Sequence, residues 1–265
     1  MNRRGKGAAV EGISCVIIAQ NEEKNIAGCV KAFKWAGETV VIDGGSRDRT
    51  AALARKAGAR VFYRKFDGYS RQKNFAVSKA SKGWVISVDA DERPEPGFEK
   101  AVRRAVENRE VDGYWLPRKN FFYGRFLRFG GQYPDYQLRL FRKNKGRFAA
   151  ADVHEGVVLK GRAGYLKRGF EHYTKEDIAS HVDALNRYTG LEAQKRGSAL
   201  FYYLLLKPFF NFIKNYIFKM GFLDGVCGLI YHYIAASYFF IREVKVMERG
   251  GMNSASLKKK IFKRR

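Results

Sequence analysis

The sequence contains little cysteine and little proline for its length. Only three cysteines and five prolines occur among 265 residues, and Cys15, Cys29 and Cys227 stand far apart. This scattering excludes a disulfide framework and a cysteine-rich metal site of the usual spacing. It is typical of small buried thiols in a reducing compartment.

Acidic residues are also scarce relative to basic ones. There are 26 Asp and Glu against 51 Lys and Arg, which gives a formal net charge of +25. Such a balance suits nucleic acid, an anionic membrane surface or a polyphosphorylated substrate, and it does not determine the fold. The 46% of hydrophobic residues excludes disorder for most of the chain, and the length allows one large domain with an appendage or two small domains.

Two nucleotide-binding signatures and long hydrophobic runs are missing. The chain has neither Gly-x-Gly-x-x-Gly nor Gly-Lys-Ser/Thr, so it lacks the dinucleotide and P-loop fingerprints. The apolar run Ile13 to Ala19 is too short for a signal sequence and predicts the first strand of a cytoplasmic protein. The run from Gly225 to Ile241 is at the lower limit for a membrane span.

Strand and helix patterns alternate in the first half of the chain. Strands are expected at 13–19, 39–42, 60–63 and 84–88, with helices at 22–34, 70–81 and one ending near 57. A helix should then run from Pro96 to about Asn108, and a strand from Asp112 to Leu116 should be ended by Pro117. The alternation predicts an α/β fold with a mainly parallel, three-layer sheet and right-handed crossovers.

Polar residues follow three of these strands where each one ends. They are Asn21 with Glu22, Asp43, and Asp89 with Asp91. Ligands of open α/β sheets bind beyond the carboxyl ends of the strands, so these side chains should meet there. Asp89 and Asp91 could converge on one oxygen-seeking cation, although an ordinary acidic turn is the alternative reading.

Several motifs carry a family resemblance in the right order. They are Ile-Ile-Ala-Gln-Asn-Glu-Glu (17–23), Val-Val-Ile-Asp-Gly-Gly-Ser-Arg-Asp-Arg-Thr (40–50), Arg-Gln-Lys-Asn-Phe-Ala (71–76) and Val-Asp-Ala-Asp-Glu-Arg (88–93). Together they resemble a family 2 glycosyltransferase with the GT-A fold, over about Ile13 to Arg249. Pro-Asp-Tyr-Gln-Leu-Arg-Leu-Phe (134–141) and Val-His-Glu (153–155) are similar to the branch that builds lipopolysaccharide or lipooligosaccharide cores.

The resemblance implies roles for individual residues. Those assigned to the nucleotide-sugar donor are Ala19, Asn21, Glu22, Asp43, Arg71, Asn74, Asp89, Ala90 and Arg139. A divalent cation, Mg²⁺ or Mn²⁺, would be held by Asp89, Asp91 and His172. Asp135 is the expected general base, with Glu155 as the other candidate. A solvated helix face remains the alternative for Arg71 and Asn74, as does a core or capping role for His172.

The implied activity is an inverting, metal-dependent transfer of a hexose. The expected donor is a UDP-sugar, with glucose the first sugar by analogy, and the expected acceptor is a membrane glycolipid such as lipopolysaccharide core. A polyprenyl-phosphate glycosyltransferase of the same fold stays open as an alternative. A basic RNA-binding protein is a further alternative, although no nucleic-acid module is visible and no nucleic-acid partner is expected.

The last third of the chain indicates helices at a membrane surface. We expect a catalytic domain over 12–174, with a nucleotide-sugar half at 12–93 and an acceptor half at 94–174. Apolar helices over 175–249 and a basic tail over 250–265 should follow. The aromatic and basic run 121–131 should form a loop near an acceptor sugar, or else pack in the core. The protein should therefore attach peripherally to the inner face of the cell membrane; the sequence leaves its oligomeric state open.

Overall fold

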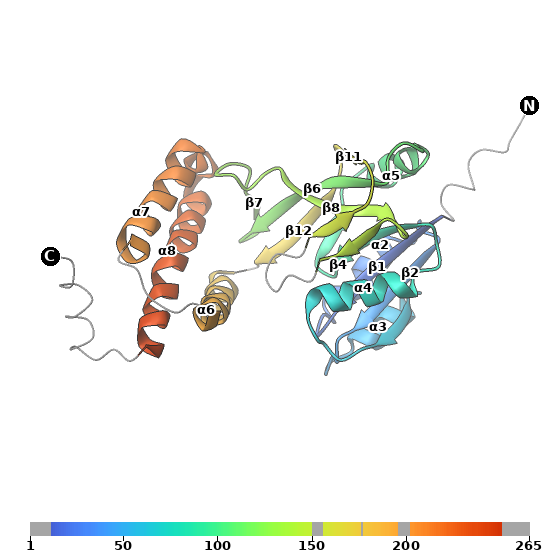
Figure 1. Ribbon diagram of the computed structural model, residues 1–265, viewed down its shortest axis with the longest axis horizontal. Helices are drawn as coiled ribbons and strands as arrows, with labels where there is room; N and C mark the ends of the chain where they lie inside the picture. Colours follow the sequence, from blue (N-terminus) through green and yellow to red (C-terminus); the bar gives the residue numbers. More distant parts are fainter. Residues whose placement is uncertain (1–11, 150–155, 176, 196–201, 251–265) are drawn as a thin grey trace, which may run out of the picture. The chain divides into compact units, whose positions relative to one another are not determined.

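The computed structural model divides the chain into two compact units, and it describes residues 12–149, 156–175, 177–195 and 202–250. The first unit comprises Met1–Lys119 and Pro134–Tyr173 (Figure 1). The second unit comprises Asn120–Tyr133 and Thr174–Arg265. The second unit therefore includes residues 120–133, which the sequence places in the acceptor half of the catalytic domain.

The first unit is an α/β structure. Its elements are β1 (Ile13–Ala19), α2 (Ile26–Ala32), β2 (Glu38–Asp43), α3 (Thr50–Lys56), β3 (Arg60–Tyr63), α4 (Tyr69–Lys79), β4 (Trp84–Asp89), β5 (Glu92–Pro94), α5 (Phe98–Val106), β6 (Gly113–Phe122), β8 (Asp135–Arg142), β9 (Gly146–Phe148), β10 (Val157–Leu159), β11 (Ala163–Tyr165) and β12 (Phe170–Lys175). The predicted fold class, a mainly parallel sheet with flanking helices followed by C-terminal helices, is confirmed.

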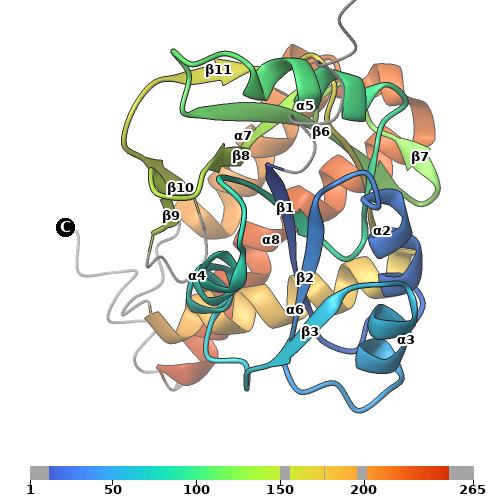
Figure 2. The same cartoon turned by 90° about the vertical axis from the view of Figure 1, so that its right-hand side faces the viewer.

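The main sheet joins a parallel half to an antiparallel half. Its strand order is β3-β2-β1-β4-β8-β6-β12-β5, and β1 to β4 run parallel. Strand β8 then pairs antiparallel with β4 and with β6. Figure 2 shows α2 and α3 on one side of the parallel strands and α4 on the other. Every parallel strand therefore ends at the edge where the acidic residues were expected to gather.

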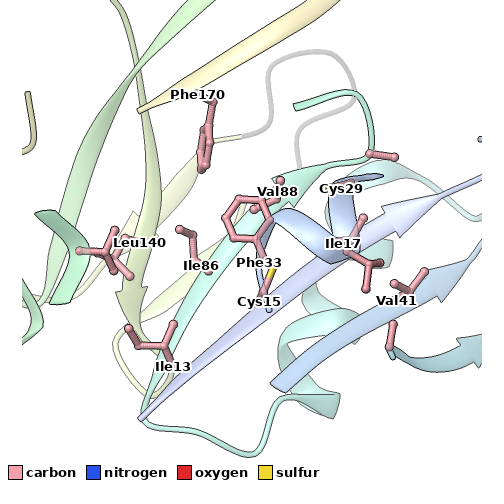
Figure 3. Packing of buried hydrophobic residues seen from close by; sticks show 14 of the residues in the cluster. Ile13, Cys15, Ile17, Cys29, Phe33, Val41, Ile86, Val88, Leu140 and Phe170 are labelled. Atoms are coloured by element: carbon pink, nitrogen blue, oxygen red, sulfur yellow. The ribbon is translucent and has the colours of Figure 1, made fainter. Parts of the chain in front are cut away.

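Strands β1 and β4 lie in the interior of the main sheet, and nearly all of their side chains are buried. Apolar, β-branched runs of this kind are typical of strands covered on both faces. The rings of Phe33, Phe98 and Phe170 pack together, with the Phe98 and Phe170 centroids 5.1 Å apart. Figure 3 shows Phe33 and Phe170 among the buried side chains around β1 and β4. Burying each ring stabilises the folded state by roughly 1.5–3 kcal/mol relative to leaving the ring exposed. Phe170 begins β12, so this packing also fixes the strand that carries His172.

Two predicted boundaries are wrong. The helix expected from Glu22 begins only at Ile26, because Asn21 adopts a left-handed conformation (φ 57°) and a turn follows it. The strand expected to end before Pro117 continues to Phe122. Pro117 has no N–H, but the register with β8 continues through Arg118, which lies opposite Asp135. The sheet thus holds the strand on both sides of the proline.

The second unit consists of helices and a short hairpin strand. Its elements are β7 (Arg125–Phe126), α6 (Ile178–Lys195), a π-helix (Tyr202–Leu206), α7 (Lys207–Phe212), a second π-helix (Ile213–Phe218), a 3₁₀-helix (Gly221–Asp224) and α8 (Gly225–Arg249). Among the residues that the structure describes, no helix combines the length and hydrophobicity needed to cross a membrane.

The aromatic run at 121–131 is partly a hairpin and partly core of the second unit. Phe121 pairs with Phe126 across a turn in which Tyr123 and Gly124 both have positive φ. Phe122 packs on Tyr231 of α8, with ring centroids 4.4 Å apart. The core-packing alternative therefore applies to part of this run.

Candidate active site

The carboxyl ends of β1, β2 and β4 bring the sequence-predicted acids to one edge of the sheet. In the strand register Ile18 pairs with Asp89 and Ala19 pairs with Asp43. The predicted gathering of polar strand ends is therefore present. Two groups of side chains can be distinguished there, one at the ends of β1 and β2 and one that extends from β4 to β8 and β12.

The first group surrounds Asp43, a buried carboxylate. Its Oδ1 accepts hydrogen bonds from the Ser46 hydroxyl (2.5 Å) and from the Ser46 N–H (3.1 Å). The Asn21 N–H donates to the same hydroxyl (2.9 Å), and the Asn21 side chain accepts from the Arg47 N–H (2.9 Å). These bonds tie the turn after β1 to the turn after β2.

Glycine is required in this turn. A Cβ on Gly44 would lie 3.3 Å from the Gln20 side chain and 3.4 Å from the Ala19 carbonyl oxygen, and Gly45 has a φ of 101°. The Gly44 N–H donates to that same Ala19 oxygen (2.8 Å). The backbone beside Asp43 thus carries no side chain at either glycine; close approach of a flat ligand to it stays a prediction.

Glu22 lies between the two groups. Its carboxylate accepts a hydrogen bond from the Asn25 side chain (2.9 Å), and its own N–H donates to the Thr50 hydroxyl. Burial raises the pKa of Glu22, and the nearby carboxylates of Asp91 and Asp48 raise it further against the opposing effect of Asn25.

In the second group Asp89 is clamped by two cations. Its Oδ2 lies 2.8 Å from Arg139 Nη2, and its Oδ1 lies 3.1 Å from the Nζ of Lys73 on α4. Burial would raise the pKa of Asp89, but Arg139 and Lys73 hold it well below the usual range. Arg139 was predicted from the sequence as a residue of the donor site, whereas no role was predicted for Lys73.

Glu92 is a second residue that the sequence did not single out. Its side chain is fully buried, and its Oε2 accepts a hydrogen bond from the Asp89 N–H (2.9 Å). Its Oε1 faces Arg139 Nη2 at 3.7 Å and Arg118 Nη1 at 3.8 Å. Burial raises the pKa of Glu92, opposed chiefly by Arg139. Glu92 thus links the two arginines to the main chain at the end of β4.

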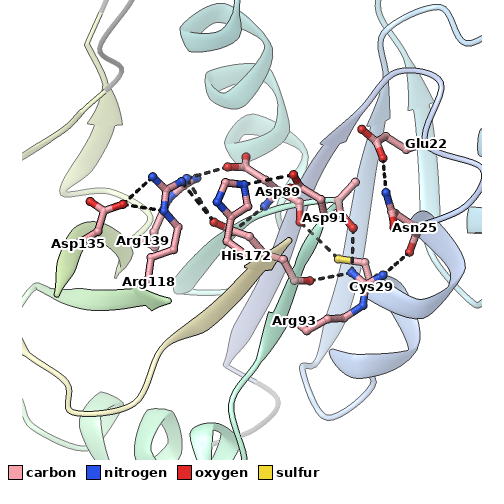
Figure 4. Close-up of polar contacts among 12 residues, drawn as sticks. Glu22, Asn25, Cys29, Asp89, Asp91, Arg93, Arg118, Asp135, Arg139 and His172 are labelled. Atoms are coloured by element: carbon pink, nitrogen blue, oxygen red, sulfur yellow. Dashed lines mark hydrogen bonds and ion pairs between the residues drawn. The ribbon is translucent and has the colours of Figure 1, made fainter. Parts of the chain in front are cut away.

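Asp91 lies beside His172, another of the three residues predicted to hold a metal ion. Its Oδ2 lies 3.2 Å from His172 Nε2, and the Asp91 side chain is 30% exposed. The pair arises because β12 runs antiparallel to β5, placing His172 opposite Glu92. Figure 4 shows Asp91 and His172 next to Asp89, with Arg139, Arg118 and Asp135 continuing the line of charges.

A carboxylate and an imidazole are suitable ligands for a divalent cation, so this pair fits the donor set that a metal would need. Within the described ranges, no group of three or more His, Cys, Asp or Glu side chains is arranged to hold a metal ion. The assignment of Asp89, Asp91 and His172 as three metal ligands stays a prediction. Asp91 and His172 lie together, whereas Asp89 contacts Lys73 and Arg139.

Asp135, the expected base, lies at the start of β8. Its Oδ2 accepts hydrogen bonds from Nε (2.9 Å) and Nη2 (2.6 Å) of Arg118, and its Oδ1 accepts one from Gln137 (2.8 Å). The side chain is 26% exposed, so a ligand can reach it. The other candidate, Glu155, lies outside the described residues, as does His154.

The remaining predicted donor residues have partners of their own. Asn74 donates to the Phe148 carbonyl and accepts from the Phe148 N–H, both at 2.9 Å. Arg71 is exposed and donates to the Asp67 carbonyl at 2.7 Å. Ala90 is buried, and its carbonyl accepts from Arg93. The assignment of these residues to a donor site stays a prediction.

Comparison with known proteins gives consistent matches. The family model described as "Glycosyl transferase family 2" matches residues 14–174. A lipopolysaccharide core biosynthesis glycosyltransferase, LpsC of Rhizobium meliloti (strain 1021), is 29% identical over 91% of this chain and 94% of its own length. An uncharacterized glycosyltransferase of Rickettsia conorii is 28% identical over 90% of each chain.

Among solved structures, the glucosyl-3-phosphoglycerate synthase of Mycobacterium tuberculosis, in complex with Mn²⁺, uridine diphosphate and glucosyl-3-phosphoglycerate, is 26% identical. The match covers 43% of this chain and 46% of that one, with a TM-score of 0.36. The likeness is thus limited to less than half of either protein.

Proposed function

The chain belongs to glycosyl transferase family 2, and on that premise we propose that it transfers a hexose, with inversion, from a nucleoside-diphosphate sugar to a membrane glycolipid. The observation that carries this proposal is the line of charges at the strand ends. In it Asp91 pairs with His172, and Asp135 is connected to Asp89 by two ion pairs, Asp135–Arg118 and Arg118–Glu92, and by the hydrogen bond from the Asp89 N–H to Glu92. The name of the Rhizobium meliloti relative supports lipopolysaccharide core as the acceptor class.

The two groups of side chains suggest that each group binds a different part of the nucleotide-sugar donor. The bare turn at Gly44 and the buried Asp43 would receive the base and ribose, because a planar group can lie against that backbone. Asp89 is neutralised by Lys73 and Arg139, so it would orient the ribose through hydrogen bonds and keep the two cations in place. UDP is the first nucleotide to test.

Asp91 and His172 would hold the divalent cation near the diphosphate. When bound, such a cation neutralises the charge that develops on the departing nucleoside diphosphate.

Asp135 would accept the proton of the acceptor hydroxyl. Arg118 and Gln137 fix the carboxylate through three hydrogen bonds, so its direction is set before the acceptor arrives. A single attack from the face opposite the leaving group inverts the anomeric centre and needs no covalent nucleophile. Glu155 remains the other candidate base.

The donor class can be tested by thermal unfolding of the wild-type protein with UDP, GDP and CMP, each with and without Mn²⁺. A ligand that binds only the folded state stabilises it by RT ln(1 + [L]/Kd), or about 2.7 kcal/mol at a hundredfold excess over Kd. We expect UDP with Mn²⁺ to raise the Tm most. Equal shifts for all three nucleotides, or none, would contradict a specific nucleoside-diphosphate site.

The second unit exposes many large apolar side chains, which supports attachment to a membrane surface. Among them are Leu205, Leu206, Phe209, Phe210, Ile217, Phe218, Met220, Phe222, Leu223, Val226, Leu229 and Tyr233. Lys214 and Lys219 are exposed within the same helices, and the whole chain carries a net charge of +25. Apolar side chains among cations favour the interface of an anionic leaflet.

Flotation with vesicles tests this attachment. Phe209, Phe218 and Val226 are 59%, 78% and 71% exposed, so replacing all three with Asp should leave the fold intact. The wild type should float with phosphatidylglycerol vesicles, and the triple variant should bind at least about a hundredfold more weakly, since each apolar side chain contributes roughly 1.5–3 kcal/mol on burial. Tyr63→Asp with Tyr165→Asp, which changes exposed rings of the first unit, is the control. Unchanged flotation of the triple variant would disprove attachment through these apolar side chains.

A further inference from the structure

A hollow lined mainly by charged and polar residues lies in the first unit, away from the acidic strand ends. Its cavity volume is about 610 Å³, within the usual range for small-molecule sites. Three segments line it: the residues just before β4, the residue before β6 and the turn after β8. The lining residues are Ser81, Lys82, Gly83, Asp112, Arg142, Lys143, Asn144 and Lys145.

The sheet itself holds these three segments together. The Lys143 N–H donates to the Gly83 carbonyl (2.9 Å), and the Arg142 N–H donates to the Asp112 carbonyl (2.8 Å). Arg142 pairs with Trp84 in the register of β4 and β8, and its guanidinium lies 4.7 Å from the centre of the Trp84 ring. The hollow is therefore built on rigid strand ends.

Positive charge in this hollow exceeds what its own acid can balance. Four cations line it and Asp112 is its single carboxylate, 3.4 Å from Arg142 Nε. The Lys143 ammonium donates to the Ala80 carbonyl at 2.5 Å, which fixes its position without neutralising it. Lys82 and Lys145 have no hydrogen-bond or ion-pair partner for their ammonium groups among the residues that the structure describes.

We propose that this hollow binds a phosphate-bearing anion. Three uncompensated positive charges around one cavity favour a multiply charged ligand, and lysine ammonium groups bind phosphate as point charges. Two of the cations are already held in position, Arg142 over the Trp84 ring and Lys143 at the Ala80 carbonyl, which reduces the ordering cost of binding.

The anion site is distinct from the candidate active site. The hollow adjoins the amino end of β4, whereas Asp89 stands at the carboxyl end of the same six-residue strand. At about 3.3 Å per residue, the two are separated by roughly 20 Å. The proposal therefore does not depend on glycosyl transfer and can hold or fail independently of it.

Isothermal titration of the full chain with inorganic pyrophosphate, in the presence of a chelator, tests the site. The variant is Lys82→Ala with Lys145→Ala, and the control is Lys56→Ala with Lys100→Ala, which removes the same charge from two exposed lysines elsewhere. We expect the Lys82 and Lys145 variant to bind at least about tenfold more weakly, through loss of two charge-assisted contacts. The control should bind like the wild type.

An equal loss of affinity in both variants would overturn the proposal, because the effect would then be one of overall charge. Absence of pyrophosphate binding by the wild type, together with equal vesicle binding by all three proteins, would also overturn it. Circular dichroism of both variants verifies that they fold.

A second arm identifies the source of the phosphate. The same three proteins are mixed with vesicles of phosphatidylglycerol and, for comparison, phosphatidylcholine. If only the Lys82 and Lys145 variant loses affinity for phosphatidylglycerol, the ligand is a lipid headgroup. If it loses pyrophosphate affinity alone, the ligand is a soluble phosphate compound. Either result supports the anion site.

Discussion

Replacing Asp135 with Asn is expected to lower kcat by a factor of about 10²–10⁴, the usual contribution of a general base. Asn keeps the size of the side chain and can still accept a hydrogen bond from Arg118, so the fold should survive. Because Asp135 is placed at the acceptor and not at the donor, the KM for the nucleotide sugar should change little. Initial rates at saturating donor measure the effect.

The matched control for this variant is Asp112→Asn. Asp112 is also an aspartate ion-paired to an arginine across the β6–β8 pair, but it lies at the other end of these strands. Its replacement should leave kcat near that of the wild type. If Asp135→Asn retained the wild-type kcat while Glu155→Gln lost it, the base would be Glu155.

Replacing Asp91 with Ala should abolish the dependence of activity on Mn²⁺ and reduce kcat/KM for the donor by at least about a hundredfold. If Asp91 holds the cation as proposed, its removal would take away negative charge that offsets the cation, and His172 would hold the cation more weakly. Activity measured across a Mn²⁺ titration tests this. The Tm without nucleotide should change little, because Asp91 is partly exposed and its described ion pair is with a single histidine.

Asp89→Asn is the informative contrast, since the two aspartates flank one alanine. Asp89 balances Lys73 and Arg139, both buried, so its loss removes a carboxylate that lies within 3.1 Å of each of these two buried cations. Breaking such a pair typically costs about 3–5 kcal/mol. We therefore expect Asp89→Asn to lower the Tm strongly and Asp91→Ala to affect chiefly metal dependence. The opposite pattern would reverse the division of roles between them.

The central strands of the parallel half, β1, β2 and β4, were predictable because nearly all of their side chains are buried. The sequence of β1 is apolar or small throughout, and the sequence-predicted limits of β1 and β3 match the observed ones. The gathering of Asp43, Asp89 and Asp91 followed from the same topology, because parallel strands end at one edge of a sheet.

The cationic half of the site was not predictable from local pattern. Lys73 lies on a polar-looking helix, and its partner Asp89 is on another element. Arg118 follows Pro117, where the strand was expected to have ended. In the sequence Glu92 looks like part of an acidic turn. In the structure it is buried and faces two arginines, Arg118 and Arg139, that are distant in sequence. Such partners become visible only when the sheet brings β4, β6 and β8 together.

The most direct test of the account is the anomeric configuration of the product. The protein would be incubated with UDP-glucose labelled with ¹³C in the sugar, Mn²⁺ and a glycolipid extract, and the labelled product examined by NMR. The label reports the anomeric centre without a purified acceptor. The account predicts that the α-linked glucose of the donor becomes β-linked in the glycolipid. A product that keeps the α configuration would contradict the single displacement with Asp135 as base.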